Sequence, residues 1–491
     1  MVTLATIAAT YVLTPFTIKA LGQEGYGTWT VITSITGFVS LMALGVPMAC
    51  VRYLAQDVAT GDLKKINTTI GSCAGLYLAI GVVAVPIGGV LMVLFNTYEI
   101  PAGFQAQSHA AFGLMVLYVA AGFFGLLPEG ILFSHHDFVP RNLVRFSGVF
   151  LRLGLTVGLL ALNASLVLLA LVQIVCLVFD VSISWLLIRR RYPGVRISLA
   201  DFDFGMIRRI FSFSLWVLVL SAGARLSFET DALVIGAFLG VGAIPFYVVA
   251  NSLIVYLMEF VVAIAAVVAP MATKLNTEGR LDELREIFLK WSKGALSLTL
   301  VAGLFLIVLG PRFIGWWIDP SYERPSGEVL QILMASSFIF LPVRGVAQPI
   351  LMGLGKPRIP AFAFLGAGLL NLLLSVLLVG PFGLTGVAIG TAIPNVLFAF
   401  VVLAVACREL NVAPASYVKY VVPRAALGGV PILALLLWCK FGLDVNTMAG
   451  LVASGSGMVL LWAITWVFFV YRQDPYVDVA QFLQARIWSR V

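Results

Sequence analysis

Length, composition and charge place this chain among membrane proteins. It has 491 residues, of which 61% are hydrophobic and only 11% are charged, and its mean hydropathy is +1.03. Soluble globular domains are about 25% charged, so this composition excludes a soluble protein with an ordinary surface. The net charge of +8 is not accompanied by a basic–aromatic groove motif, and no nucleic-acid partner is expected.

The apolar residues fall into blocks of roughly 18–25 residues, the length of a helix that crosses a bilayer. The blocks are continuously apolar rather than alternating, so helices are expected and membrane strands are not. We predict an all-α polytopic membrane protein with about fourteen transmembrane helices. The predicted crossings are 2–21, 28–50, 70–95, 111–133, 144–162, 165–188, 210–230, 245–271, 294–318, 328–352, 360–379, 384–406, 421–439 and 447–470.

The basic residues predict the orientation of these crossings. Of the 31 Lys and Arg residues, twenty-five fall in loops and flanks on one side, four fall on the other, and Arg225 and Arg344 lie within helices. Cytoplasmic loops of membrane proteins carry an excess of Lys and Arg. We therefore expect a multi-pass protein of the inner (plasma) membrane with both termini in the cytoplasm.

The sequence roughly repeats after a shift of 218 residues. The stretch 20–34 overlays 238–252, which matches Gly22 to Gly240, and 59–66 overlays 277–284, which matches Gly61 to Gly279. Six crossings per half is an even number, so the halves are expected to be parallel repeats. A duplicated bundle favours a transporter of the alternating-access kind.

The repeat predicts three parts of the chain. They are an N-terminal six-helix bundle (1–200), a C-terminal six-helix bundle (201–410), and a last part (411–491) with two extra helices and an amphipathic cytoplasmic tail. In the tail, Phe482, Leu483 and Trp488 are expected to dip into the membrane surface.

Neither metal nor enzyme chemistry is expected. The adjacent His135 and His136 point apart on a helix and lack the spacing of a zinc site, so a solvated loop is the better interpretation. The cysteines are scattered singly and are predicted to be small core residues rather than a paired framework. No cofactor is predicted. The five cysteines are Cys50, Cys73, Cys176, Cys407 and Cys439.

The strongest functional signal is the segment "LSAGARLSFETDALVIGAFLG" (220–240), in which Arg225, Glu229 and Asp231 stand among apolar residues. An arginine at the centre of a membrane helix costs about 2.5–3.5 kcal/mol on insertion scales. Arg225 and Glu229 are four residues apart and can therefore pair on one helical face. This pairing would explain both charges by structure alone, without a functional role. It does not account for Asp231, for which a place at the outer interface is a second structural interpretation.

Two further arginines extend this signal. Arg344 lies between Pro342 and Pro349, and this pattern predicts a broken, water-accessible helix because proline removes a helical hydrogen bond. Arg52, near the end of the second crossing, either snorkels to the cytoplasm or faces a cavity.

We interpret these charges together as the lining of a wet cavity between the halves that binds an anion. A guanidinium group donates two parallel hydrogen bonds to a phosphate. The predicted substrate-binding residues are Arg52, Arg225 and Arg344. The predicted acidic residues, which tune the cavity or bind a coupling ion, are Glu229, Asp231 and Glu259.

Three segments resemble the Wzx-type polysaccharide flippases of the multidrug, oligosaccharidyl-lipid and polysaccharide exporter superfamily. They are "ALGQEGYGTWTVITSITGFVSLMALGVPMACVRYLA" (20–55), "TDALVIGAFLGVGAIPFYVVANSL" (230–253) and "GPFGLTGVAIGTAIPNVL" (380–397). The resemblance implies a V-shaped pair of six-helix bundles plus two helices. It also implies translocation of an undecaprenyl-diphosphate-linked oligosaccharide repeat unit to the outer leaflet, with Arg52, Arg225 and Arg344 near the diphosphate.

The implied partners are this lipid-linked oligosaccharide, membrane lipids, and a polysaccharide polymerase and glycosyltransferases. Two alternatives remain open. A multidrug or organic-cation antiporter of the same superfamily would be expected to line its cavity with carboxylates and aromatic rings, because arginines repel a cation. A scaffold that transports nothing would not need charges inside its helices.

Overall fold

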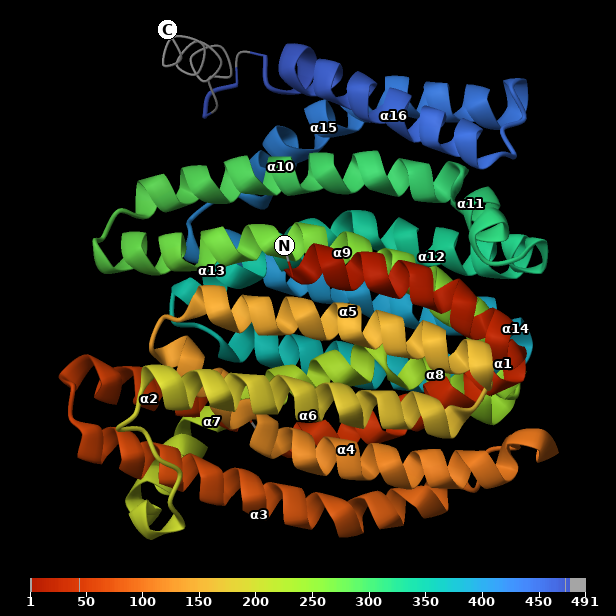
Figure 1. The fold of residues 1–491 in the computed structure, drawn as a ribbon. Helices are drawn as coiled ribbons and strands as arrows, with labels where there is room; N and C mark the ends of the chain where they lie inside the picture. The colour runs from red at the N-terminus through yellow and green to blue at the C-terminus, as the bar shows by residue number, and fades with distance from the viewer. Residues whose placement is uncertain (1, 44, 473, 477–491) are drawn as a thin grey trace, which may run out of the picture. The chain divides into compact units, whose positions relative to one another are not determined.

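The computed structural model describes residues 2–43, 45–472 and 474–476 (Figure 1). Within these ranges the chain is helical and none of the residues lies in a strand. Among the described residues, eleven helical segments are long and apolar enough to cross a membrane. The predicted fold class, an all-α polytopic membrane protein, is confirmed. The predicted tail with Phe482, Leu483 and Trp488 lies outside the described residues.

The helices form two compact units, unit 1 (Met1–Pro245) and unit 2 (Phe246–Val491). Unit 1 contains α1 (Val2–Val39), α2 (Val46–Thr60), α3 (Leu63–Phe95), α4 (Ala102–Ser134), α5 (Phe138–Leu162), α6 (Leu166–Arg191), α7 (Phe204–Phe228) and α8 (Thr230–Phe238). Unit 2 begins in the first turn of α9 (Ile244–Thr277). It continues with α10 (Leu281–Val308), α11 (Gly310–Trp317), α12 (Glu323–Pro342), α13 (Gln348–Gly353), α14 (Arg358–Glu409), α15 (Pro414–Leu437) and α16 (Met448–Thr465).

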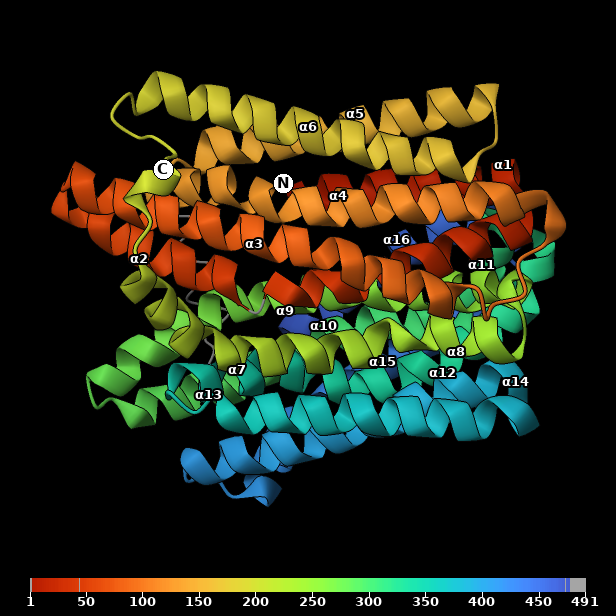
Figure 2. The same cartoon turned by 90° about the horizontal axis from the view of Figure 1, so that it is seen from below.

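Each unit is held by apolar contacts between long helices. In unit 1, α4 and α6 pack side by side and α5 lies against α6 (Figure 1, Figure 2). Buried side chains of α2, α3 and α4, among them Leu54, Tyr77 and Ile131, form a core in this unit. In unit 2, Val301 of α10 and Ile432 of α15 belong to a core that includes α16. These cores fix the helices that carry the polar residues.

Two of the eleven apolar segments each contain two predicted crossings. The segment Val2–Thr60 breaks at Gly22 (φ 72°, ψ 175°), and Arg358–Glu409 breaks at Gly383 (φ 58°, ψ −135°). Only glycine adopts such angles without steric cost. Thirteen of the fourteen predicted crossings therefore fall in these segments, and the remaining one, 210–230, corresponds to α7.

Backbone geometry supports the 218-residue repeat. Gly22 and its counterpart Gly240 have φ of 72° and 83°, and Gly61 and its counterpart Gly279 have φ of 71° and 73°. All four lie in the left-handed region that favours glycine. The matched glycines thus make the same kind of turn in both repeats.

The contacts divide the chain at a different point from the repeat. α7 packs against α2 and α3 and belongs to unit 1, whereas the repeat assigns it to the bundle 201–410. A contact boundary reflects packing and a repeat boundary reflects sequence periodicity, and the two need not coincide. The ranges 1–200, 201–410 and 411–491 stay predictions about the repeat.

The prediction that all cysteines are unpaired was wrong for two of them. Cys50 of α2 and Cys73 of α3 form a disulfide, with their Cα atoms 6.3 Å apart. They are 23 residues apart in the sequence, with the turn at Gly61 between them. Sequence spacing did not reveal the pair, because only the packing of α2 against α3 brings the two side chains together. Cys176, Cys407 and Cys439 are free and buried.

Candidate functional site

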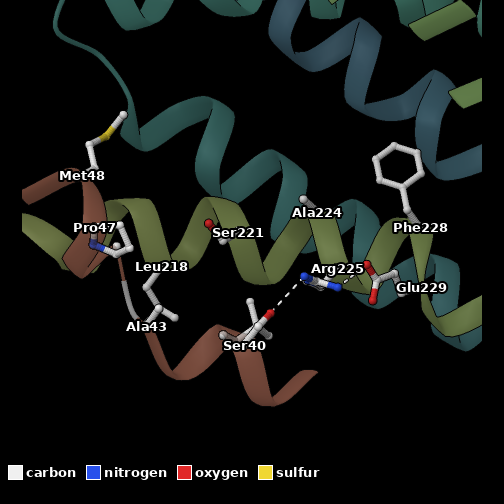
Figure 3. Close-up of a pocket in the computed structure, with 12 residues that line it drawn as sticks. Ser40, Ala43, Pro47, Met48, Leu218, Ser221, Ala224, Arg225, Phe228 and Glu229 are labelled. Atoms are coloured by element: carbon white, nitrogen blue, oxygen red, sulfur yellow. Dashed lines mark hydrogen bonds and ion pairs between the residues drawn. The ribbon is translucent and has the colours of Figure 1, made fainter. Parts of the chain in front are cut away.

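A cavity lies within unit 1, between the bend that joins α1 to α2 and one face of α7 (Figure 3). Its volume is about 550 Å³. Most of its wall is apolar, and its charges come from the C-terminal end of α7. The lining residues are Ser40, Leu41, Ala43, Gly45, Pro47, Met48, Leu218, Ser221, Ala224, Arg225, Phe228 and Glu229.

The bend that forms one wall follows from local sequence. After α1 ends at Val39, a 3-10 turn spans Ser40–Ala43. Gly45 then adopts the left-handed conformation (φ 74°, ψ 4°), and Pro47 stands in the first turn of α2. Proline fits the first helical turn because its missing N–H would have no helical partner there. The second predicted crossing is therefore bent, and the bend leaves the Ser40 hydroxyl facing the cavity.

Arg225 is the central polar residue of this cavity. Its Nη1 forms an ion pair with Glu229, and its Nη2 donates a hydrogen bond to the Ser40 hydroxyl at 3.0 Å (Figure 3). The Ser40 hydroxyl in turn donates to the carbonyl of Gly37 at 2.7 Å. The predicted pairing of Arg225 with Glu229 on one helical face is confirmed. The pair also lines a cavity, with side chains 31% and 33% exposed.

Gly37 of α1 makes room for this pair. A Cβ at this position would lie 2.8 Å from Nη1 of Arg225 and 2.8 Å from Oε2 of Glu229. Such a distance is too short for a real side chain, so an alanine here would displace the charged groups. Sequence reasoning identified Arg225 and Glu229 but missed Ser40 and Gly37, which carry no charge.

The other predicted residues of unit 1 lie apart from this lining. Arg52 is exposed on α2, with its guanidinium carbon 6.0 Å from the centre of the Tyr53 ring. Asp231 stands in the first turn of α8 and is 2% exposed. A carboxylate is stabilised near a helix N-terminus. Asp231 is thus buried among protein atoms, and its place at the outer interface of the membrane stays a prediction.

Arg344 and Glu259 both belong to unit 2. α12 ends at Pro342, a π-helical turn spans Val343–Ala347, and α13 carries Pro349 in its first turn. The predicted break around Arg344 is thus a π-helical turn within a continuous helical run, and the predicted access of water to it stays a prediction. Its guanidinium carbon lies 4.9 Å from the centre of the Phe364 ring, and it interacts electrostatically with Glu259, which is exposed on α9.

The structure thus brings four of the six predicted residues together in two pairs, one in each unit. Arg225 lies with Glu229 in unit 1, and Arg344 lies near Glu259 in unit 2. The interpretation of Arg52, Arg225 and Arg344 as one substrate-binding set stays a prediction. In the part of the chain that the structure describes, no group of three or more His, Cys, Asp and Glu side chains is placed to hold a metal ion.

These features define a polytopic, all-helical membrane protein with a cavity lined in part by charged residues. The family described as "Polysaccharide biosynthesis protein" matches residues 1–276, which is more than half of the chain. The chain belongs to this family, as the resemblance in its sequence led us to expect.

Several proteins of similar sequence or fold have names that give a transport role. The chain is 22% identical over 393 residues to a Shigella flexneri protein named "Putative O-antigen transporter", covering 78% of this chain and 90% of that protein. A multidrug transporter of the MATE family in its inward-facing conformation superimposes with a TM-score of 0.68 at 17% identity, covering 83% of this chain and 94% of the other. The lipid II flippase MurJ gives 0.66 at 12% identity, covering 93% and 98%. At these identities the structures show the fold alone.

Proposed function

We propose that this protein is a flippase, which moves a lipid-linked oligosaccharide from the cytoplasmic to the outer leaflet for the synthesis of a cell-surface polysaccharide. Membership of the polysaccharide biosynthesis family supports the substrate class, and the duplicated helical fold supports alternating access. In this proposal the protein is a transporter of the inner membrane rather than an enzyme. Both termini lie in the cytoplasm, and a polysaccharide polymerase and glycosyltransferases work beside it.

The observation that carries the proposal is the Arg225 guanidinium in the wall of a 550 Å³ cavity. The substrate proposed is an oligosaccharide on undecaprenyl diphosphate, whose diphosphate is anionic. A guanidinium binds such oxygens through two parallel hydrogen bonds. Arg225 now donates to Glu229 and Ser40, and a diphosphate oxygen replaces the Glu229 carboxylate when the substrate enters.

The remaining predicted residues have supporting roles in this proposal. Arg52 and Arg344 provide further positive charge along the route of the headgroup. Glu229, released from Arg225 by the substrate, accepts a proton or a sodium ion and thereby couples transport to an ion gradient. Asp231 and Glu259 tune the local charge. The coupling is tested by collapsing the proton and sodium gradients separately, and export that survives both treatments contradicts it.

An organic-cation antiporter is the alternative function, and the fold does not separate the two. The multidrug transporter and the lipid II flippase superimpose almost equally well, with TM-scores of 0.68 and 0.66. In this proposal the cavity favours the flippase: once Glu229 has bound a proton or a sodium ion, the Arg225 guanidinium repels a cation and attracts a diphosphate.

The proposal is tested by export of the lipid-linked oligosaccharide in cells that depend on this protein. We expect Arg225→Ala to reduce export by at least about tenfold, because one charge-assisted hydrogen bond is worth roughly that factor. Arg225→Lys keeps the positive charge but cannot donate two parallel hydrogen bonds, so it should retain part of the export. Membrane insertion is checked for each variant on the same cells.

Arg324→Ala is the matched control. Arg324 forms the same kind of ion pair with a residue four positions later, Glu328, but its side chain is 90% exposed and outside the cavity. Its loss should leave export unchanged. Normal export by an inserted Arg225→Ala protein, or an equal loss in both variants, overturns the role of Arg225.

A further inference from the structure

Unit 1 contains a second cavity, of about 480 Å³, where α4 and α6 meet the loop 192–198 that follows α6. Its volume lies within the range of ligand pockets, about 300–1,000 Å³. One part of its wall is apolar and another part carries arginine side chains. The lining residues are Phe124 and Pro128 of α4, Val181, Ser182, Trp185 and Arg189 of α6, and Val195, Arg196 and Ile197 of the loop.

The polar part of this cavity is positively charged. Arg189 and Arg196 are both exposed, and no Asp or Glu is among the lining residues. Arg189 forms no ion pair within the described ranges, and its guanidinium carbon lies 5.9 Å from the centre of the Trp185 ring. The Nε of Arg196 forms an ion pair with Oδ2 of Asp201 at 3.3 Å. Its two terminal nitrogens can therefore donate to a ligand.

The loop that carries Arg196 is held in place by neighbouring helices. The Asn67 side chain of α3 donates to the carbonyl of Gly194 and accepts from the backbone N–H of Arg196, both at 3.1 Å. Tyr192, just after α6, donates its hydroxyl to Asp137 at 2.6 Å. Burial and this hydrogen bond raise the pKa of Tyr192 to about 12, so the phenol keeps its proton at neutral pH. The position of Arg196 is therefore prepared before any ligand arrives.

The predicted orientation of the helices places this cavity at the level of the lipid headgroups. α6 ends in three consecutive arginines, Arg189–Arg191, on the side of the membrane that the distribution of basic residues assigns to the cytoplasm. Trp185 precedes Arg189 by one helical turn. Tryptophan is enriched at membrane interfaces. Basic pockets between membrane helices on the cytoplasmic side suit anionic headgroups.

We propose that this cavity binds the headgroup of an anionic phospholipid from the inner leaflet. The guanidinium groups of Arg189 and Arg196 hold the phosphodiester, and Phe124, Val181 and Ile197 contact the glycerol end of the acyl chains. Ser182 donates its hydroxyl to the headgroup. Pro128 lacks an N–H, so the carbonyl of Phe124 has lost its helical donor and accepts a hydrogen bond from a headgroup hydroxyl, such as that of phosphatidylglycerol.

Native mass spectrometry of the purified full-length protein tests this site. The protein is titrated with phosphatidylglycerol and, separately, with phosphatidylcholine and phosphatidylethanolamine of the same acyl chains. We expect phosphatidylglycerol to bind at least about tenfold more tightly than phosphatidylcholine, and Arg189→Ala/Arg196→Ala to abolish that preference, since each arginine contributes a charge-assisted contact. Asn67→Ala should weaken the preference less, because it only frees the loop.

The matched control is Arg190→Ala/Arg408→Ala, which removes two exposed arginines that do not line the cavity. It should keep the preference for phosphatidylglycerol. Size-exclusion profiles and thermal unfolding show whether each variant is folded. An unchanged preference in a folded Arg189→Ala/Arg196→Ala protein overturns the proposal, as does equal binding of all three lipids. Displacement of phosphatidylglycerol by soluble glycerol 3-phosphate at similar concentration also overturns it, because the site would then bind a soluble phosphate ester as well as a lipid.

Discussion

Two ion pairs inside the apolar units differ in their surroundings. In unit 1, Arg225 and Glu229 line a cavity, with side chains 31% and 33% exposed. In unit 2, Lys293 of α10 and Asp474, beyond α16, are 1% and 0% exposed, with Nζ 2.5 Å from the carboxylate. Lys293 also donates to the carbonyl of Val470 at 2.8 Å, so this second pair is enclosed by the protein.

Hydrogen bonds around the enclosed pair indicate a structural role. The hydroxyl of Tyr420 donates to Asp474 at 2.8 Å, and the rings of Tyr420 and Tyr471 lie 4.9 and 4.7 Å from Nζ of Lys293. A buried pair persists only when such partners satisfy it. The comparison teaches that a charge within an apolar unit is available to a ligand only where a cavity reaches it.

The largest expected effect is the loss of stability when the enclosed pair of Lys293 and Asp474 is broken. Asp474→Ala leaves Lys293 buried without its counter-charge, and breaking such a pair costs about 3–5 kcal/mol. We expect a large loss of thermal stability in detergent, and a partial recovery in Lys293→Leu/Asp474→Leu, where neither charge remains. Glu328→Ala, which breaks the exposed pair with Arg324, should cost about 1 kcal/mol or less. Equal effects of Asp474→Ala and Glu328→Ala would contradict the structural role.

A reversal of the cavity pair separates transport from stability. Arg225→Glu should abolish export, because it puts two carboxylates in the same wall. Arg225→Glu/Glu229→Arg restores the pair and returns a guanidinium to the cavity, so export should recover in part. The free energy of unfolding of this double variant should stay within about 1 kcal/mol of that of the unsubstituted protein, because the pair is partly exposed. Export assays and thermal unfolding on the same preparations measure both quantities.

Two results would contradict the expected export by the Arg225→Glu and reversed-pair variants. If Arg225→Glu exports normally, the cavity does not need a positive charge at this position. If the reversed pair is as inactive as Arg225→Glu while both proteins are folded, the position of the guanidinium matters and not only its presence in the wall.

The smallest expected effect comes from Gly37→Ala. The added Cβ pushes on Arg225 and Glu229, whose ends are flexible, so stability should change by less than about 1 kcal/mol. Export should fall several-fold, because the guanidinium is displaced. Gly113→Ala is the control, since a Cβ there meets no atom within 4 Å. Equal export by the two variants would show that the exact position of Arg225 is unimportant.

Much of the fold was predictable because it depends on local sequence. Apolar blocks of bilayer length predicted the crossings, and the matched glycines at Gly22 and Gly240 predicted turns that the backbone makes. The spacing of Arg225 and Glu229 predicted their ion pair, since residues four apart share one face of a helix. Pro342 and Pro349 predicted a break around Arg344, where the structure has a π-helical turn.

Tertiary structure decided the contacts between residues far apart in the chain. Arg225 and Ser40 are 185 positions apart, and Lys293 and Asp474 are 181 apart. Asn67 meets the loop at Arg196 across 129 positions. Helix periodicity says which face a residue occupies but not which helix covers that face. The sequence therefore determined the helices, their breaks and the charges they carry. The packing of the helices determined which of those charges meet a cavity and which are enclosed.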